Sequence, residues 1–350
     1  MTDITTVDPR FRIHQGWLKL LTNYAFNTSS YRVEYQKLLQ QYPEQANDIN
    51  YVLQVHQDII NKTGKVPSIR SAAGLDPLTF GCFSVATHTA ESLLDVLKVF
   101  EAYFIYVAGQ LDLVLKVSDQ YVDLFLLDNS DPTSYRSTSL GIALVISIIL
   151  ETLKIVNHNQ SIACELFVRK IEIPNEEVEH FKQRYNCRHI HKGGVRKIRF
   201  QRHELDIKNP NYCRDTYECN IAAVRKVAYK LRTNDVRQQI FAIFDQQKSL
   251  ADITLNHVAH EMLTTPRTLS RRLSQVDTTF KNLLQLYRMQ KALLLLSDPD
   301  VNNTEVAYQL GFSELSSFSR AFKLWTGESP SDFREKSLKQ YDAINKALLY

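Results

Sequence analysis

Cysteine is scarce in this sequence. Five cysteines occur in 350 residues, an odd number that is spread from Cys82 to Cys219. Dense, evenly paired cysteines are typical of small secreted domains, whereas a large chain with few of them is typical of a reducing compartment. The first residues are polar and do not form an apolar secretory leader. The sequence therefore predicts no disulfide framework and a cytoplasmic location.

Long apolar runs are also missing. The longest one, residues 140–150, spans 11 residues, whereas a helix needs about 20 apolar residues to cross a bilayer. A run of this length is typical of a helix that is buried in a protein core. We therefore expect no membrane partner.

The short motifs of common catalytic sites are absent too. The sequence has no Gly-x-Ser-x-Gly, no His-Glu-x-x-His and no Gly-x-x-x-x-Gly-Lys. Cys187, His189 and His191 would offer three metal ligands on one face of a strand, but no partner cluster lies nearby in the sequence. We favour a polar strand face over a metal site. The sequence predicts no catalytic residue, no metal, no cofactor and no enzyme.

The composition that remains is ordinary for a globular protein with two domains. Apolar residues make up 44% of the chain and charged residues 23%. The net charge of +4 supports nucleic-acid binding only weakly. Between residues 250 and 336, ten basic residues face ten acidic ones. Binding of DNA there requires the basic groups to lie together on one side.

The first 230 residues mix helical and strand periods. The predicted helices cover residues 11–62, 89–107, 138–157 and 175–185, with Thr89 as the cap of the second. The predicted strands cover residues 111–117, 121–127, 163–171 and 195–201, of which the first two form a hairpin. This order is typical of an α+β domain.

The strongest positive signal is a helix-turn-helix pattern at residues 304–323. Ala307 is small enough for two helices to cross closely, and Gly311 suits a left-handed turn between them. Phe312, Phe318 and Phe322 are spaced to form a small core beneath the second helix. The polar residues of that helix are left free for a groove or for phosphates: Ser316, Ser317, Ser319, Arg320 and Lys323.

A similar pattern occurs earlier, at residues 254–273. Thr254 is placed to cap one helix, and Thr265 with Pro266 to open the next. Residues 280–296 form an apolar helical connector between the two patterns. A stiff connector would fix two reading helices at roughly 34 Å, one turn of DNA.

Together these residues resemble the DNA-binding domain of AraC-type (AraC/XylS) bacterial transcriptional regulators, over residues 236–336. Leu263 and Asp277 depart from the pattern, because each stands where the family has glycine. The bulk of Leu263 predicts a different turn geometry in the first unit. The resemblance implies double-stranded DNA as a partner and the following DNA-binding residues: Arg267, Thr268, Ser270, Arg271, Leu315, Ser316, Ser317, Arg320 and Lys323.

Residues 74–81 and the helix after them resemble the N-terminal regulatory domain of a subset of AraC-type proteins, which implies effector sensing or dimerisation. Residues 182–202 hold eight basic residues and no acid. This run is either a solvated face, which is commoner, or an anionic-effector site. Aromatic residues nearer the N-terminus form either core, which we favour, or an apolar pocket. The candidate effector residues are Arg188, Arg196, Arg199, Phe100 and Tyr103.

The sequence thus predicts an α+β N-terminal regulatory domain (1–233), an all-α C-terminal domain with two helix-turn-helix units joined by a linker helix (234–336), and a tail (337–350). We expect a sequence-specific, DNA-binding bacterial transcription regulator that is a homodimer and responds to a small-molecule effector. RNA polymerase is a candidate partner. The alternative is a ligand-independent regulator whose N-terminal domain is only a dimerisation scaffold.

Overall fold

The computed structural model describes residues 12–20, 48–49, 61, 69–129, 139–168, 173, 175–192, 195–298 and 300–335. The chain forms two compact units, and the main division between them lies between Leu231 and Arg232. The predicted tail and most of the predicted helix over 11–62 lie outside the described residues. Among the helices that are described, none has the length and apolar character needed to cross a membrane.

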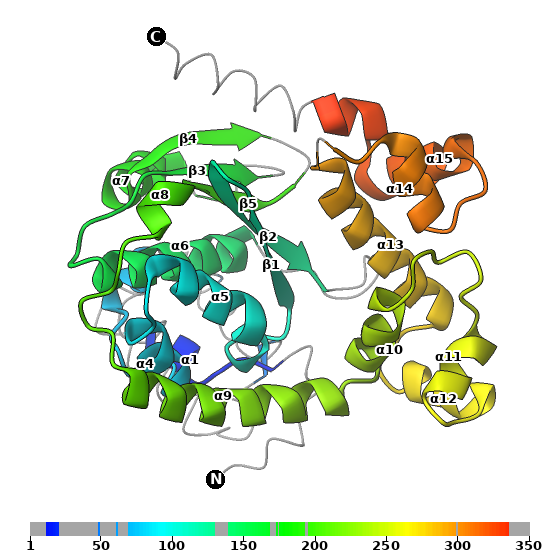
Figure 1. Cartoon of the computed structure of the whole chain (residues 1–350), viewed down its shortest axis with the longest axis horizontal. Coiled ribbons are helices and arrows are strands. Elements are labelled where there is room, and N and C mark those ends of the chain that lie inside the picture. The colour runs from blue at the N-terminus through cyan, green and yellow to red at the C-terminus, as the bar shows by residue number, and fades with distance from the viewer. Residues whose placement is uncertain are drawn as a thin grey trace. The chain divides into compact units, whose positions relative to one another are not determined.

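One five-stranded sheet organises the N-terminal unit (Figure 1). Its strands are β1 (Leu111–Val117), β2 (Tyr121–Asp128), β3 (Cys164–Val168), β4 (Cys187–Lys192) and β5 (Lys197–Gln201), in the order β1-β2-β5-β3-β4. β1 and β2 form the predicted antiparallel hairpin, and β5 pairs antiparallel with both β2 and β3. The four predicted strands are therefore confirmed, and the fifth, β4, covers the segment of Cys187, His189 and His191 that was also read as a strand.

Two long helices pack on the apolar face of this sheet: α5 (Leu93–Tyr103) and α6 (Ser139–Val156). Phe100 of α5 and Ile146 of α6 are buried in one core with Leu124 and Phe200 of the sheet. The remaining described elements of this unit are α1 (Gly16–Leu20), η3 (Ile69–Gly74), α4 (Cys82–His88), η4 (Phe104–Tyr106), η5 (Asn175–Glu177), α7 (Val178–Tyr185), α8 (Arg202–Leu205) and α9 (Arg214–Asn234).

The predicted cap of α5 is wrong. Ser92, not Thr89, adopts the extended backbone of an N-cap and accepts a hydrogen bond from the Asp95 N–H. Thr89 instead follows α4, and its hydroxyl donates to the Val85 carbonyl at 2.8 Å. The Thr89 side chain is thus already used by the preceding helix, so α5 starts later than its apolar period suggests.

The other face of the sheet carries a buried cluster of charges. The Asp123 carboxylate of β2 accepts two hydrogen bonds of 2.6 Å from Arg199 and one of 2.8 Å from Lys197, both on β5. Lys197 is 1% exposed, and its ammonium lies 4.7 Å from the centre of the Phe167 ring. Desolvation lowers the pKa of Lys197 to about 8, although the negative charge of Asp123 acts to raise it.

The C-terminal unit is helical in its described part. It contains α10 (Val236–Asp245), α11 (Leu255–Glu261), α12 (Pro266–Ser274), α13 (Phe280–Leu296), α14 (Asn303–Gln309) and α15 (Leu315–Thr326) (Figure 1). The first half of α13 belongs to one core with α10, α11 and α12, through Leu283 and Tyr287. The same helix also packs against α14 and α15. The predicted connector between the two helix-turn-helix units is confirmed.

A second connection between those units was not predicted. The loop at residues 249–251 sits on the turn at residues 309–312, and we call this contact the clamp. Ser249 Oγ donates to the Tyr308 carbonyl at 2.8 Å, and the Leu250 N–H donates to the Gln309 carbonyl at 3.0 Å. Arg288 of α13 reinforces the clamp by donating to the Leu250 carbonyl at 3.2 Å.

Gly311 permits this close approach. Its φ is +79°, and a Cβ atom at this position would lie 2.4 Å from the Leu250 carbonyl carbon. We expect Gly311→Ala to lower the free energy of unfolding of the C-terminal unit by about 3 kcal/mol or more. The left-handed backbone alone costs about 1–2 kcal/mol, and displacement of Leu250 would break hydrogen bonds of about 1 kcal/mol each.

Gly327→Ala is the matched control for this prediction, because Gly327 has a φ of +87° and an added Cβ atom would meet no other atom within 4 Å. It should cost only the conformational 1–2 kcal/mol, roughly. Denaturant unfolding can be followed by Trp325 fluorescence after Trp17→Phe, since the chain has two tryptophans. Equal losses in the two glycine variants would show that the clamp contributes no stability.

The buried Lys197 predicts a pH dependence of the N-terminal unit. The unfolded chain keeps this proton up to the ordinary pKa of 10.5, whereas the folded chain loses it near 8. Between these values the unfolded state binds more protons, so stability should rise with pH, by at most about 1.4 kcal/mol per pH unit.

Lys197→Met should remove this rise, and Lys226→Met, at an exposed position of α9, should retain it. Unfolding measured from pH 7.5 to 9.5 by Trp17 fluorescence, after Trp325→Phe, tests this. An unchanged slope in Lys197→Met would contradict it.

Candidate nucleic-acid interface

The second helix-turn-helix unit is built as its sequence predicts. The Asn302 side chain caps α14 by accepting from the Glu305 N–H, and Ala307 is buried where α14 meets its neighbours. Gly311 takes the left-handed conformation in the turn. Phe318 and Phe322 of α15 are fully buried, and Phe312 packs 5.7 Å from the Phe318 ring. One face of α15 is therefore fixed inward, and the opposite face is left for solvent.

The first unit uses the same local devices. The side chains of Thr254 and Thr265 accept hydrogen bonds from the N–H groups of His257 and Thr268, and Pro266 is the first residue of α12. The predicted caps are thus confirmed. Leu269 and Leu273 are buried at the spacing that Phe318 and Phe322 have in α15, so α12 is anchored in the same way.

The predicted difference in turn geometry at Leu263 is wrong. Leu263 has a φ of +51°, in the left-handed region that Gly311 also occupies. The Leu263 N–H bonds to the carbonyl three residues back, and the next N–H to the carbonyl five residues before it, as at Gly311. Leu263 is 94% exposed, so its side chain meets no obstacle. The strain of the left-handed backbone is local, about 1–2 kcal/mol.

The outward faces of α12 and α15 carry the predicted DNA-binding residues. Thr268 and Ser317 are half-buried, and Ser317 Oγ accepts from the Arg320 guanidinium at 3.4 Å. Thr268 Oγ1 lies 2.9 Å from the hydroxyl of Thr265. The other predicted residues are exposed: Arg267, Ser270, Arg271, Leu315, Ser316, Arg320 and Lys323.

The charges on these two helices have one sign. α12 carries Arg267, Arg271 and Arg272 and no acidic residue, and α15 carries Arg320 and Lys323 and no acidic residue. Of the three arginines in α12, Arg272 is half-buried and donates to Gln239 of α10 at 3.2 Å. The even charge balance of the domain therefore does not extend to its reading helices, which attract phosphates.

Glu314 is a residue of this surface that the sequence reasoning missed. It occupies the N-cap position of α15, where its carboxylate makes no capping bond but accepts from the Ser316 hydroxyl at 3.1 Å. A carboxylate at this position is favoured by the helix dipole, although it adds a negative charge beside the basic residues of α15. Its position directly before the predicted helix was the signal in the sequence.

The candidate effector residues do not come together as one site. Phe100 is 1% exposed in the core on the apolar face of the sheet, and Tyr103 lies at the end of the same helix. Arg196 is half-buried between β4 and β5 in the sequence. Arg188 and Arg199, in contrast, line one shallow depression.

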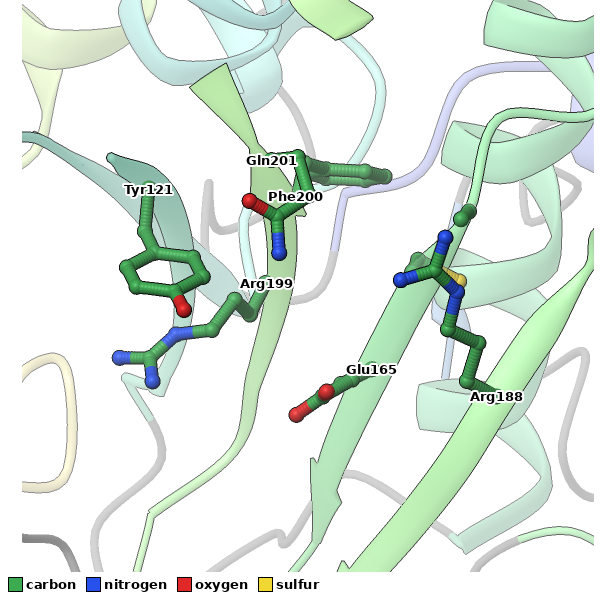
Figure 2. Close-up of a pocket in the computed structure, with 8 residues that line it drawn as sticks. Tyr121, Glu165, Arg188, Arg199, Phe200 and Gln201 are labelled. Atoms are coloured by element: carbon green, nitrogen blue, oxygen red, sulfur yellow. The ribbon is translucent and has the colours of Figure 1, made fainter. Parts of the chain in front are cut away.

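That depression lies where β3 and β5 run side by side, and it is open to solvent, with enclosed room for about one water molecule. Figure 2 shows Arg188 on one side, Arg199 and Tyr121 on the other, and Glu165 between them. Arg188 is exposed, whereas Arg199 is held by Asp123. The pKa of Glu165 is lowered. Burial raises it, but the hydrogen bond and charge of His191, 3.2 Å away, lower it by more.

The rest of the basic run at residues 182–202 is dispersed rather than gathered. Arg184 binds Glu151 through two hydrogen bonds of 2.9 and 2.7 Å, and Lys182 and Arg202 pair with acids on their own helices. Glu151 is distant in the sequence, whereas Glu179 and Asp206 flank the run. With these three basic residues paired to acids, the run does not form a single anion-binding patch.

The predicted polar strand face holds for His189 and His191, whose ring centres lie 5.7 Å apart, but Cys187 does not share it. Cys187 is 4% exposed and belongs to the core, whereas His189 is exposed to solvent. His191 stacks on Phe167 with ring centres 4.6 Å apart. Within the described part of the chain, no group of three or more metal-ligating side chains converges.

Comparison with known proteins agrees with the geometry of the C-terminal unit. A family model described as a helix-turn-helix domain matches residues 258–336. An ornithine utilization regulator of Pseudomonas aeruginosa is 42% identical over 81 residues, which are 23% of this chain and 24% of the relative. An uncharacterized HTH-type transcriptional regulator of Mycobacterium tuberculosis is 33% identical over 144 residues, 40% of this chain and 41% of the relative.

These matches span less than half the length of the curated relatives. Among solved structures, the transcriptional regulator CdpR of Pseudomonas aeruginosa aligns over 86% of this chain and 98% of its own, at 18% identity and a TM-score of 0.38. The turn geometry, the buried anchors and the family match all concern the same residues. The C-terminal unit is a double helix-turn-helix domain, and it is similar to the DNA-binding domain of AraC-type regulators.

Proposed function

We propose that this protein is a sequence-specific, DNA-binding transcription regulator. The observation that carries the proposal is the pairing of α12 and α15, two helices with the same turn before them, the same buried anchor spacing, and basic but no acidic residues within either helix. Helices presented in this way enter the major groove, where their N-terminal residues contact base edges. No common catalytic motif in the sequence competes with this function.

The two helices would bind one duplex together. α13 and the clamp hold both units in one arrangement, and two helices that enter successive major grooves on one face of a duplex lie about one DNA turn apart, roughly 34 Å. In α12, Arg267 and Arg271 are long enough for bidentate bonds to guanine. In α15, Arg320 would play that part, and Ser316, Ser317 and Lys323 would contact bases or phosphates.

Arg320→Ala should separate base reading from phosphate contact. We expect binding to a selected specific site to weaken by about 10- to 100-fold, because a bidentate contact to guanine is worth roughly 1–3 kcal/mol. Binding to random duplex should weaken far less. Fluorescence anisotropy at one fixed salt concentration measures both affinities. Lys281→Ala removes an exposed charge from α13 and is the control. Equal losses on both duplexes would make Arg320 a phosphate contact instead.

We further propose that the N-terminal unit binds a small effector at the depression in Figure 2. Arg188 offers an exposed guanidinium for a carboxylate, and Glu165 offers a carboxylate for an ammonium group. The two signs within one depression suit a zwitterion such as an amino acid. The relative named for ornithine utilization makes ornithine a reasonable first probe. The homodimer, the contact with RNA polymerase and the ligand-independent scaffold remain predictions.

Calorimetry on the full chain tests the effector proposal. Ornithine, other amino acids, dicarboxylates and inorganic phosphate are titrated one at a time. We expect at least one zwitterion to release binding heat, and Arg188→Ala to lower that affinity by more than about tenfold, the loss of one charge-assisted bond. Arg225→Ala, an exposed arginine on α9, should bind normally. If no probe gives heat, or if Arg188→Ala binds as tightly, the depression is not the effector site.

A further inference from the structure

The first turn of α15 presents an apolar side chain to solvent. Leu315 is 40% exposed, although the anchors of this helix, Phe318 and Phe322, are fully buried. The core beneath α15 therefore does not need Leu315. An exposed leucine on a surface that is otherwise polar and basic would be of no use for phosphate binding.

The residues beside Leu315 constrain what this turn can face. Ser316 is tied to Glu314 by a hydrogen bond of 3.1 Å, and Ser317 to Arg320 by one of 3.4 Å. The Glu314 carboxylate would be repelled by DNA phosphates, whereas amino groups on base edges can donate to it. A turn that places Glu314 next to Leu315 is thus suited to contact base edges in the groove and not the phosphates of the backbone.

The major groove offers one apolar group for a leucine to contact. Each base pair shows donors and acceptors there, and only thymine adds a C5-methyl group. Contact with that methyl removes apolar surface of both partners from water. Facing any other base, Leu315 would cover polar atoms without replacing their hydrogen bonds to water.

The equivalent turn of α12 has different chemistry. Counted from the buried anchors Leu269 and Phe318, Leu315 corresponds to Pro266 and Ser316 to Arg267. The first turn of α12 therefore presents an arginine, which suits guanine, where α15 presents a short hydroxyl beside a leucine. The two units are built alike but expose different side chains.

We propose that Leu315 reads a thymine through its C5-methyl group, in the half-site bound by α15. The proposal rests on the proposed function. It deepens that function by assigning unlike half-sites to one chain: α12 would read its half-site with Arg267 and Arg271, and α15 with Arg320 and the methyl contact of Leu315.

The test removes the methyl group without changing base pairing. Binding sites are first selected from a random duplex library with the full-length protein. The half-site of α15 is the one whose base preferences relax when the selection is repeated with Arg320→Ala; if none relaxes, the whole selected site is treated as that half-site. Each thymine in that half-site is then replaced singly by deoxyuridine, which lacks only the C5-methyl group. We expect one replacement to weaken binding by about three- to tenfold, as for one buried methyl group.

Variants then connect this methyl group to the leucine. Leu315→Ala should abolish the penalty of deoxyuridine at that position while keeping affinity for random duplex, because Leu315 is not part of the core. Leu324→Ala is the matched control, since Leu324 is another exposed leucine at the far end of α15, 82% exposed. It should leave the deoxyuridine penalty intact.

Each outcome is decisive. A half-site of α15 that contains no thymine, a deoxyuridine scan without a sensitive position, or a penalty that persists in Leu315→Ala would overturn the proposal while specific binding stands. If the selection enriches no sequence at all, the proposed function itself fails, and the assignment of Leu315 fails with it. The two failures are thus distinguished by the first step.

Discussion

The constraint on which the C-terminal unit depends is the close approach of two backbones at Gly311. The loop at residues 249–251 opens the first helix-turn-helix unit, and it rests on the turn of the second with no room for a Cβ atom. α13 packs against helices of both units, and the clamp joins the same two units at a second point. The two contacts together restrict how α12 can turn relative to α15.

Comparison of Leu263 with Gly311 shows why glycine is needed at only one of the two turns. Both residues have a positive φ and the same hydrogen-bond pattern. Leu263 projects into solvent, so the first turn costs only local backbone strain of about 1–2 kcal/mol. At Gly311 a side chain would collide with Leu250. Glycine is therefore needed at this position because another chain segment lies against it. The left-handed backbone alone does not require glycine.

Local signals in the sequence predicted local structure well. Caps such as Thr254 and Thr265, the turn at Gly311 and the buried Phe318 follow from neighbouring residues, and the structure confirms them. Partners far apart in the sequence were not predictable in this way. The basic run at 182–202 reads as one patch, yet strand alternation and pairing bring Lys197 and Arg199 to Asp123, 74 and 76 residues away. The clamp was missed for the same reason, since it joins residues 59 positions apart.

The first turns of α12 and α15 expose different side chains, and this difference affects the symmetry of the DNA site that such a protein would bind. A symmetric dimer of identical readers requires a palindrome, because its two-fold axis is repeated in the site. Here both helices belong to one chain in a fixed order, and α12 presents Pro266 and Arg267 where α15 presents Leu315 and Ser316. A site that matches both has a direction. Under the proposed function, one copy of the chain would therefore be oriented on the duplex by sequence alone, and a second copy would add affinity without being needed to define that orientation.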